Sequence, residues 1–333
     1  MMVEIRAADL PTAYQMALKE VLDKGEIVSP RGQQTREISP LITIIENPQK
    51  RVIPFVNRQI NPLLSLVQML WYFQGRDDVE MPSFYAAQLK KYANHLTGKF
   101  DGAYGPRIVN YDGKINQLDA MYLRLSIDKD SRRALMTIYD PTRDFLETSV
   151  DVPCNFGAQA MIRNGKLDWY QFIRSQDLFW GYSYDLTEFS LMQAIMAGWL
   201  HLDVGKFTNI CTSAHLYKKD WEAAERIIAE ESNFYAEAIP LDARMTREET
   251  QTNFPFLYAV ELRARTNSLS EAFMHNELRD KEDFVKTMAA MLFLYSKYKH
   301  TAEKLENYFK FFPAQPYDFK LYMWDWLKQR NRI

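Results

Sequence analysis

The sequence predicts an α+β fold in which a helical region follows a body of strands and apolar helices. Two observations support this prediction. Segments rich in β-branched residues recur through the first two thirds of the chain, and apolar segments long enough for buried helices lie between them. Hydrophobic residues make up 47% of the 333 residues, which is enough for a large core.

The chain is predicted to begin with a helix and to continue into strands. Residues 12–24 place apolar side chains at helical spacing, and the polar stretch after them, with its Gly and Pro, is predicted to be a loop. The segment 36–56 is rich in β-branched residues and broken by Pro, which predicts two strands joined by a turn. An apolar run at 62–75 is typical of a buried helix, and 83–97 predicts a more amphipathic one.

The middle of the chain alternates in strand fashion. Three such segments occupy 132–141, 154–175 and 205–217, and an Asn-Gly pair at 164–165 predicts a hairpin turn within the second. A long apolar helix is predicted at 186–202. This alternation of strands and apolar helices predicts a sheet covered by helices.

A helical, charged region begins at about residue 222. Its apolar residues fall roughly on one helical face, and neither a repeat nor a Gly/Ser linker separates it from the rest. We therefore divide the chain into a body at 1–221 and a helical C-terminal extension at 222–333 that packs on it.

Charge and hydropathy exclude several classes of protein. With 41 basic and 43 acidic residues the formal net charge is -2, so no whole-molecule field would hold a nucleic acid or an anionic membrane. Any bound anion must be met by local arginines. The longest apolar run, at 288–295, falls short of the roughly 18 residues of a membrane helix, and the start shows no secretory pattern. We expect a cytoplasmic protein.

The two cysteines, Cys154 and Cys211, stand apart from each other and from any His cluster. This argues against a disulfide framework and against a structural metal site. A lone cysteine is then either a reactive thiol or a small buried residue.

An ordered set of short motifs runs through residues 152–219. A Pro-Cys pair opens it, a Gln lies five positions after the Cys, and a Gly-Lys-Leu turn, Arg-Ser-x-Asp, a Gly, an aromatic before Asp and His-Leu-Tyr follow in turn. This order resembles the central half of a thymidylate synthase. Upstream, "VLDKGEIVSPRG", "MLWYFQG", "AYG" and "DSRR" are similar to further motifs of that family, so the resemblance covers about residues 10–220.

The resemblance implies a large mixed sheet packed by helices, a homodimer formed through that sheet, and a one-carbon transfer. The donor would be 5,10-methylenetetrahydrofolate and the acceptor C5 of a pyrimidine nucleoside monophosphate. Cys154 would be the nucleophile that adds to C6 and makes C5 enamine-like. Arg174 resembles the arginine that approaches this sulfur, and a positive neighbour lowers a thiol pKa. Cys211 lacks such neighbours and is expected to be core.

The same resemblance implies a set of substrate contacts. A 5′-phosphate is best met by forked guanidinium groups. It would be bound by Arg31, Arg174 and Ser175 of one subunit, and by Arg132 and Arg133 reaching across from the partner. The sugar hydroxyl would meet His215 and Tyr217, and the base and sugar pocket would be lined by Gln159 and Ser213.

Asp185 stands where thymidylate synthases carry Asn. An amide pairs with both O4 and N3–H of uracil, whereas a carboxylate suits the exocyclic amine and a protonated N3 of cytosine. Family members with Asp here are cytidylate hydroxymethylases, so the resemblance implies a cytosine nucleotide. The alternative is a surface Asp that caps the helix after it.

On the folate side the resemblance implies contacts by Asp177, Tyr184 and Gly181, and it places Tyr104 near the C5 proton. Core packing is the alternative role of both tyrosines. Gln68 departs from the family, which has a proton-transferring Glu there, so Asp185 would take over or the activity would differ. The folate-stacking Trp is also absent, which favours capture of the methylene by water over its reduction.

These residues lead to one preferred hypothesis and two alternatives. The preferred one is hydroxymethylation of C5 of dCMP or CMP. The first alternative is methylation of dCMP or dUMP, and the second is a nucleotide-binding homologue with little catalysis.

Overall fold

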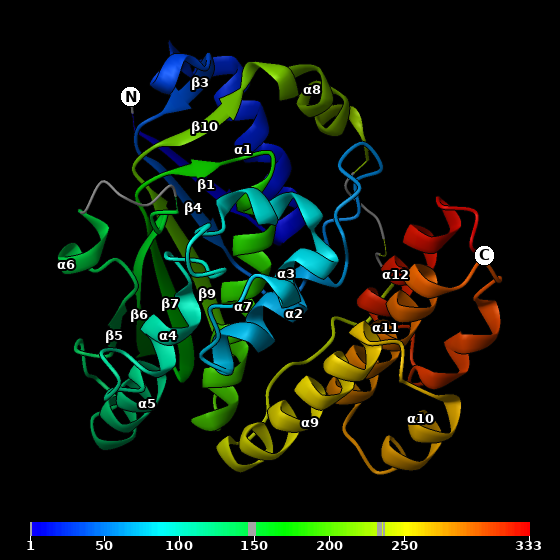
Figure 1. Ribbon diagram of the computed structural model, residues 1–333. Coiled ribbons are helices and arrows are strands. Elements are labelled where there is room, and N and C mark those ends of the chain that lie inside the picture. The colour runs from blue at the N-terminus through cyan, green and yellow to red at the C-terminus, as the bar shows by residue number, and fades with distance from the viewer. Residues whose placement is uncertain (1, 146–150, 232–234, 236) are drawn as a thin grey trace.

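A mixed sheet of six strands forms the centre of the molecule (Figure 1). The computed structural model describes residues 2–145, 151–231, 235 and 237–333. The strands are ordered β1 (Val3–Ala7), β4 (Leu41–Ile45), β9 (Asp203–Cys211), β7 (Lys166–Ile173), β6 (Asn155–Arg163) and β5 (Leu135–Thr137). The pairs β1–β4 and β7–β9 are parallel, and the other pairs are antiparallel. The mixed α+β fold and the hairpin at Asn164-Gly165 are thereby confirmed.

A second sheet of four strands lies beside the first. Its order is β2 (Glu26–Val28), β3 (Thr35–Ile38), β10 (Ala214–Tyr217) and β8 (Gln176–Asp177). The prediction of a loop after the first helix was therefore wrong for β2, whereas β3 begins one residue before the segment predicted to form strands. Long-range pairing decides this, because β3 is held between β2 and β10 and its backbone groups bond to both. The two strands predicted within 36–56 are present as β3 and β4, which are joined at Ser39-Pro40, and residues 46–56 form an irregular loop.

Helices cover one face of the large sheet (Figure 1). Helix α1 (Leu10–Lys24) contacts β1 and β4, and α7 (Gly181–Trp199) contacts β7 and β9. Helix α2 (Leu64–Phe73) packs on α7, which is buried on nearly all sides. These three predicted helices are confirmed. The smaller helices of the body are α3 (Glu80–Tyr85), α4 (Tyr104–Val109), α5 (Gln117–Ile127) and α6 (Pro141–Asp144).

The amphipathic helix predicted at 83–97 is wrong. Helix α3 ends at Tyr85, the backbone turns at Ala86, and a separate 3-10 helix follows at Ala87–Tyr92. Tyr85 turns inward, and its hydroxyl donates to Glu261 at 3.2 Å. A contact with the C-terminal region thus overrides the local helical pattern.

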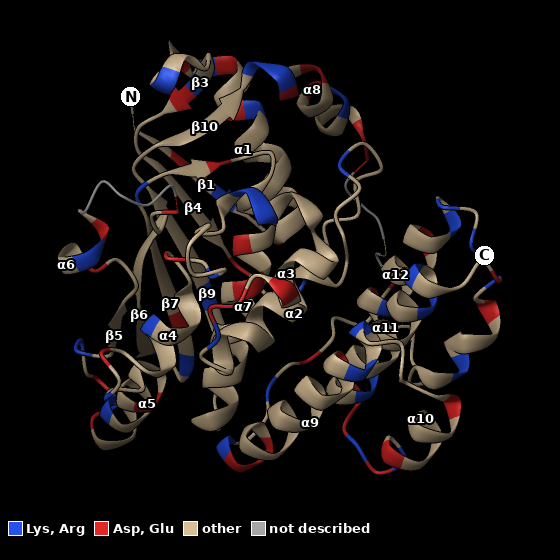
Figure 2. Ribbon diagram, in the orientation of Figure 1, with Lys and Arg blue, Asp and Glu red and all other residues tan. Residues whose placement is uncertain are grey.

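The region after residue 220 is helical, as predicted. It contains α8 (Trp221–Ala229), α9 (Arg247–Arg265), α10 (Glu271–Glu277), α11 (Asp283–His300), a 3-10 helix (Glu306–Phe311) and α12 (Asp318–Lys328). Helix α8 packs on α1, while α9 contacts α2, α7 and α11. No helix among the described residues is long and apolar enough to span a membrane. Figure 2 shows both signs of charge interspersed over the body and the C-terminal helices.

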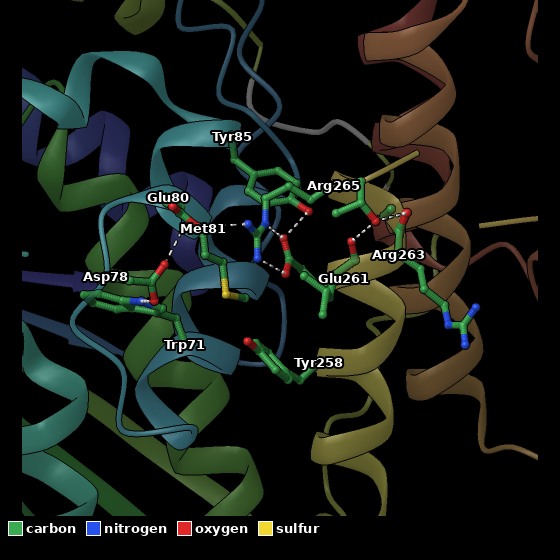
Figure 3. A network of polar contacts seen from close by, with 12 residues as sticks. Trp71, Asp78, Glu80, Met81, Tyr85, Tyr258, Glu261, Arg263 and Arg265 are labelled. Atoms are coloured by element: carbon green, nitrogen blue, oxygen red, sulfur yellow. Dashed lines mark hydrogen bonds and ion pairs between the residues drawn. The ribbon is translucent and has the colours of Figure 1, made fainter. Parts of the chain in front are cut away.

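A polar network joins α9 to the body (Figure 3). Glu261 is fully buried and accepts hydrogen bonds from Tyr85 and from the Arg265 Nε at 3.0 Å. Arg76 binds Asp78 at 2.6 Å, and Asp78 also accepts from the Trp71 indole at 3.0 Å. The bond from Tyr85 to Glu261, and the bond from the Arg76 Nη1 to the Tyr258 hydroxyl at 2.5 Å, cross from the body to α9. The extension and the body therefore share one interior.

We expect Glu261→Ala to lower the free energy of unfolding by about 2 kcal/mol, because it leaves the Tyr85 hydroxyl and the Arg265 guanidinium without their buried partner. Denaturant unfolding measures this. Glu277→Ala, at an exposed position of α10, is the control and should change stability by less than about 0.5 kcal/mol. Equal effects of the two variants would contradict a structural role for the network.

Candidate active site

Cys154 lies immediately before β6, where the β6–β7 hairpin brings it beside the end of β7. Asn155 pairs with Ile173, and the Arg174 amide donates to the Cys154 carbonyl at 2.9 Å. The Arg174 guanidinium is anchored by the Pro153 carbonyl at 2.8 Å from Nε, and its Nη2 atom lies 4.0 Å from the Cys154 Sγ. The register of one hairpin therefore places a fixed positive charge beside the thiol.

The electrostatic balance at Cys154 differs from the predicted one. Desolvation raises the pKa of the thiol above its usual value, and this outweighs the opposing effects of Arg174 and Arg31. The charges of Asp185 and Asp151 raise the pKa further. The expectation of a net lowered pKa was therefore wrong. Burial therefore favours the protonated thiol over the thiolate in the free protein.

Asp185 lies in the first turns of α7 and is held by a chain of amides. The Gln176 Nε2 donates to the Asp185 Oδ2 at 2.9 Å, and the Asn209 Nδ2 donates to the Gln176 Oε1 at 3.0 Å. Because α7 already begins at Gly181, Asp185 does not cap it, and that alternative is excluded. Burial raises the pKa of Asp185 to about 6, so its carboxyl can exchange a proton near neutral pH.

Gln176 and Asn209 were missed by the sequence analysis. Both are buried, Gln176 in β8 and Asn209 in β9. A signal for Gln176 was present, because it lies between Ser175 and Asp177 in the same motif. Asn209 carries no local signal, since only the pairing of the sheets brings it to Gln176.

The predicted phosphate ligands fall into two groups. Arg31 occupies an exposed turn, has a left-handed backbone with φ of 53°, and lowers the Cys154 pKa. It therefore belongs to the same site as Arg174, which Ser175 follows directly. Arg132 and Arg133 are exposed and precede β5, and the Arg132 carbonyl accepts from the Gln159 Nε2 at 2.8 Å. Arg132, Arg133 and Gln159 thus lie together at the β5 edge of the sheet.

The small sheet assembles the predicted sugar contacts. His215 in β10 pairs in register with Asp177 in β8 and with Glu37 in β3. The His215 ring meets the Tyr217 ring edge-on at 5.3 Å. The Ser213 hydroxyl donates to Glu37, so this serine is already engaged in the free protein. Glu37 was not predicted as a site residue, because only the pairing of β3 with β10 brings it to Ser213 and His215.

The predicted folate residues lie around the start of α7. The Asp177 Oδ1 accepts from the Phe179 and Trp180 amides at 2.9 and 3.2 Å, and burial raises the pKa of this carboxyl. The Tyr184 hydroxyl accepts from the Asn61 amide at 3.2 Å. Gly181 opens the helix. The Trp180 ring is 39% exposed, which offers an aromatic surface beside Asp177.

Two further predicted residues come from α4 and α2. Tyr104 begins α4, and burial together with the charges of Asp185 and Cys154 raises its pKa well above normal. Its ring lies 5.4 Å from that of Tyr72. Gln68 is partly exposed on α2. Cys154, Arg174, Arg31, Asp185 and Tyr104 are thus within electrostatic reach of one another.

This fold and this thiol site define the class of protein. The family model described as thymidylate synthase matches residues 12–255, and the chain belongs to this family. The match continues past residue 221 through α8 into α9, and our division at that residue stays a prediction.

Among known proteins, the chain is 32% identical over 221 residues to a deoxyuridylate hydroxymethyltransferase of Bacillus phage SP01, covering 63% of this chain and 57% of that protein. It is 30% identical to a protein of the same name from Pseudomonas phage M6, covering 54% of this chain and 51% of that one. A protein of Methanococcoides burtonii provisionally named a thymidylate synthase is 29% identical, with 67% of this chain and 94% of that protein covered. The chain thus spans about half the length of the two phage relatives.

Proposed function

We propose that this protein transfers a one-carbon unit from 5,10-methylenetetrahydrofolate to C5 of a cytidine monophosphate and releases the 5-hydroxymethyl product. The observation that carries the proposal is the Asp185 carboxyl, whose Oδ2 is fixed as an acceptor by Gln176 within reach of the Cys154 thiol. The names of the two phage relatives support a hydroxymethyl product. The missing stacking tryptophan supports water capture as well.

The residues suggest how C5 is activated. The neutral Cys154 thiol gives its proton to the Asp185 carboxylate as sulfur bonds to C6, and Asp185 passes this proton to N3 of cytosine. The electron pair of the C5–C6 double bond is thereby free to make C5 nucleophilic. Arg174 and Arg31 stabilise the transient thiolate and neutralise the charge of the phosphate.

The start of α7 fits a folate. The Trp180 ring borders this region with the Arg58 guanidinium 4.4 Å from its centroid, and Asp177 offers a carboxyl for a pterin amide. When bound, the folate supplies a methylene group at the oxidation level of formaldehyde. The roles assigned to Asp177, Tyr184 and Gly181 are part of this proposal.

A homodimer is proposed on the open face of the large sheet. Phe156 and Phe172 point away from α7 and are 54% and 37% exposed, and Leu135 is 54% exposed. Exposed apolar side chains gathered on one sheet face are typical of a protein interface. A partner on this face would bring its own Arg132 and Arg133 to the site, as the phosphate assignment requires.

A second candidate is hydroxymethylation of deoxyuridylate. The names of the phage relatives favour it, and so does the pKa of about 6 for Asp185. In its protonated form Asp185 has one donor and one acceptor, which together match O4 and N3–H of uracil.

Release of tritium to water from 5-tritiated nucleotides tests the proposal. We expect release from dCMP or CMP in the presence of methylenetetrahydrofolate, with a product heavier than the substrate by one formaldehyde. Faster release from dUMP would select the second candidate. A methyl product would select a thymidylate synthase type of reaction, and absence of release from all three nucleotides would contradict every enzyme assignment.

A further inference from the structure

Glu188 is a buried acidic residue that the chemistry above does not use. It lies on α7 three residues after Asp185 and is 1% exposed. Its Oε2 accepts a hydrogen bond from the Tyr72 hydroxyl at 2.8 Å. Its Oε1 is buried and has no hydrogen-bond partner among the described residues. A buried polar atom without a partner is rare and costly, so it needs an explanation.

The groups that face Glu188 come from three helices. Tyr72 reaches it from α2, Tyr104 from α4, and Asp185 lies on α7 itself. Burial, and then the charge of Asp185, raises the pKa of Glu188 well above its usual value, while the Tyr72 hydroxyl opposes this. Burial therefore favours the protonated form of the Glu188 carboxyl, which can hold a proton inside the site.

The position of Tyr72 links Glu188 to the departure at Gln68. These two α2 residues are four apart, so they lie on the same face of the helix. Tyr72 makes its bond to Glu188 from that face. On α7, Asp185 and Glu188 are three apart and also share a face. A carboxyl group from α7 thus lies opposite the face of α2 that carries Gln68. The amide of Gln68 cannot exchange protons.

We propose that Glu188, oriented by Tyr72, is the proton-holding residue of this active site and supplies from α7 the carboxyl group that position 68 lacks. The role rests on the proposed pyrimidine chemistry. Glu188 acts through Asp185, so it is a positioning residue. Once Asp185 has passed its proton to N3, Glu188 transfers its own proton to the new carboxylate, directly or through one water. Before the bond between sulfur and C6 breaks, Asp185 returns this proton to Glu188. N3 then gives its proton to the Asp185 carboxylate, which passes it to the departing Cys154 sulfur, so that the thiol, Asp185 and Glu188 regain their starting protonation.

The test compares Glu188→Gln with the wild type in tritium release and in its pH profile. The amide keeps the shape and can still accept from Tyr72, but it cannot exchange a proton, so we expect kcat to fall by about 10²-fold with little change in KM. The double variant Gln68→Glu/Glu188→Gln should regain at least about tenfold of this loss, because it restores a carboxyl to the α2 face. Ser190→Ala, which removes another buried side-chain bond of α7, is the control and should keep wild-type kcat.

A Glu188→Gln variant with wild-type kcat and pH profile would overturn the inference while leaving the proposed function intact. The inference would also be overturned if Ser190→Ala lowered kcat as much as Glu188→Gln does. The same holds if the double variant Gln68→Glu/Glu188→Gln did not regain activity over Glu188→Gln. Infrared spectra give a readout independent of turnover. At a pH well above the value of about 6 for Asp185, the wild type should show a protonated carboxyl band that Glu188→Gln lacks. Equal spectra would overturn the inference, and a wild type that releases no tritium would overturn the proposed function and this role together.

Discussion

A Cys154→Ala variant is expected to lose tritium release from C5 almost completely, by about 10⁴-fold or more, because the covalent bond to C6 is what makes C5 reactive. The position of the sulfur supports this. It lies at an exposed residue, 4.0 Å from the Arg174 guanidinium and within reach of Arg31 and Asp185. Tritium release under saturating nucleotide and folate measures the effect.

Cys211→Ala is the matched control. Cys211 is buried in β9 and lies in the core, where its removal costs packing but touches no reacting group. We expect normal kcat and a slightly lower unfolding temperature. Turnover by Cys154→Ala comparable to that of Cys211→Ala would refute the nucleophile.

An Asp185→Asn variant is expected to reverse the preference between cytosine and uracil by about 10²-fold, since exchanging one buried hydrogen-bonding pair is worth roughly 1–3 kcal/mol. The amide can donate to O4 and accept from N3–H of uracil, but it cannot carry a proton to N3 of cytosine. The ratio of kcat/KM for dCMP and dUMP measures the change. An unchanged ratio would mean that Asp185 does not face the base.

The pH dependence of the wild type provides a second measure of Asp185. Cytosine activation needs the carboxylate form to accept the thiol proton, so kcat/KM for dCMP should fall as the pH drops through about 6. Uracil recognition needs the protonated form, so kcat/KM for dUMP should fall as the pH rises through the same value. Both pH dependences of kcat/KM should be absent in the Asp185→Asn variant.

Asp177→Asn is the control for these measurements, because it changes a carboxyl of the same motif that bonds the start of α7. We expect it to alter the KM for the folate without changing the preferred base. A change of base preference in both variants would show that Asp185 has no special position.

Local patterns were sufficient for the hairpin and for the two long apolar helices. Asn164-Gly165 sets the turn, and the register that starts there runs from Arg163 and Lys166 to Gly157 and Phe172. A register shift between Asn155 and Gly157 then moves the pairing by one residue, so that Arg174 comes to Cys154. Turn rules therefore account for the hairpin, while the placement of Arg174 at the thiol also depends on this shift and was expected only from the resemblance.

Long-range contacts decided what the patterns could not. Strands β2 and β3 form within a polar stretch because β10, nearly two hundred residues later in the chain, pairs with β3. Helix α3 stops at Tyr85 because that side chain reaches Glu261. The prediction of a low pKa for the Cys154 thiol was wrong for a similar reason. The desolvation that raises this pKa depends on the tertiary packing around the thiol.

The order of motifs along the chain was thus enough to indicate the family, and the resemblance to that family then implied the thiol and its arginine. The tertiary structure alone decided which groups surround the buried carboxyls of α7. It placed Gln176 and Asn209 behind Asp185, and it placed Glu188 against Tyr72. A pKa depends on burial and on neighbouring charges, and both arise only when α2, α4 and α7 pack together.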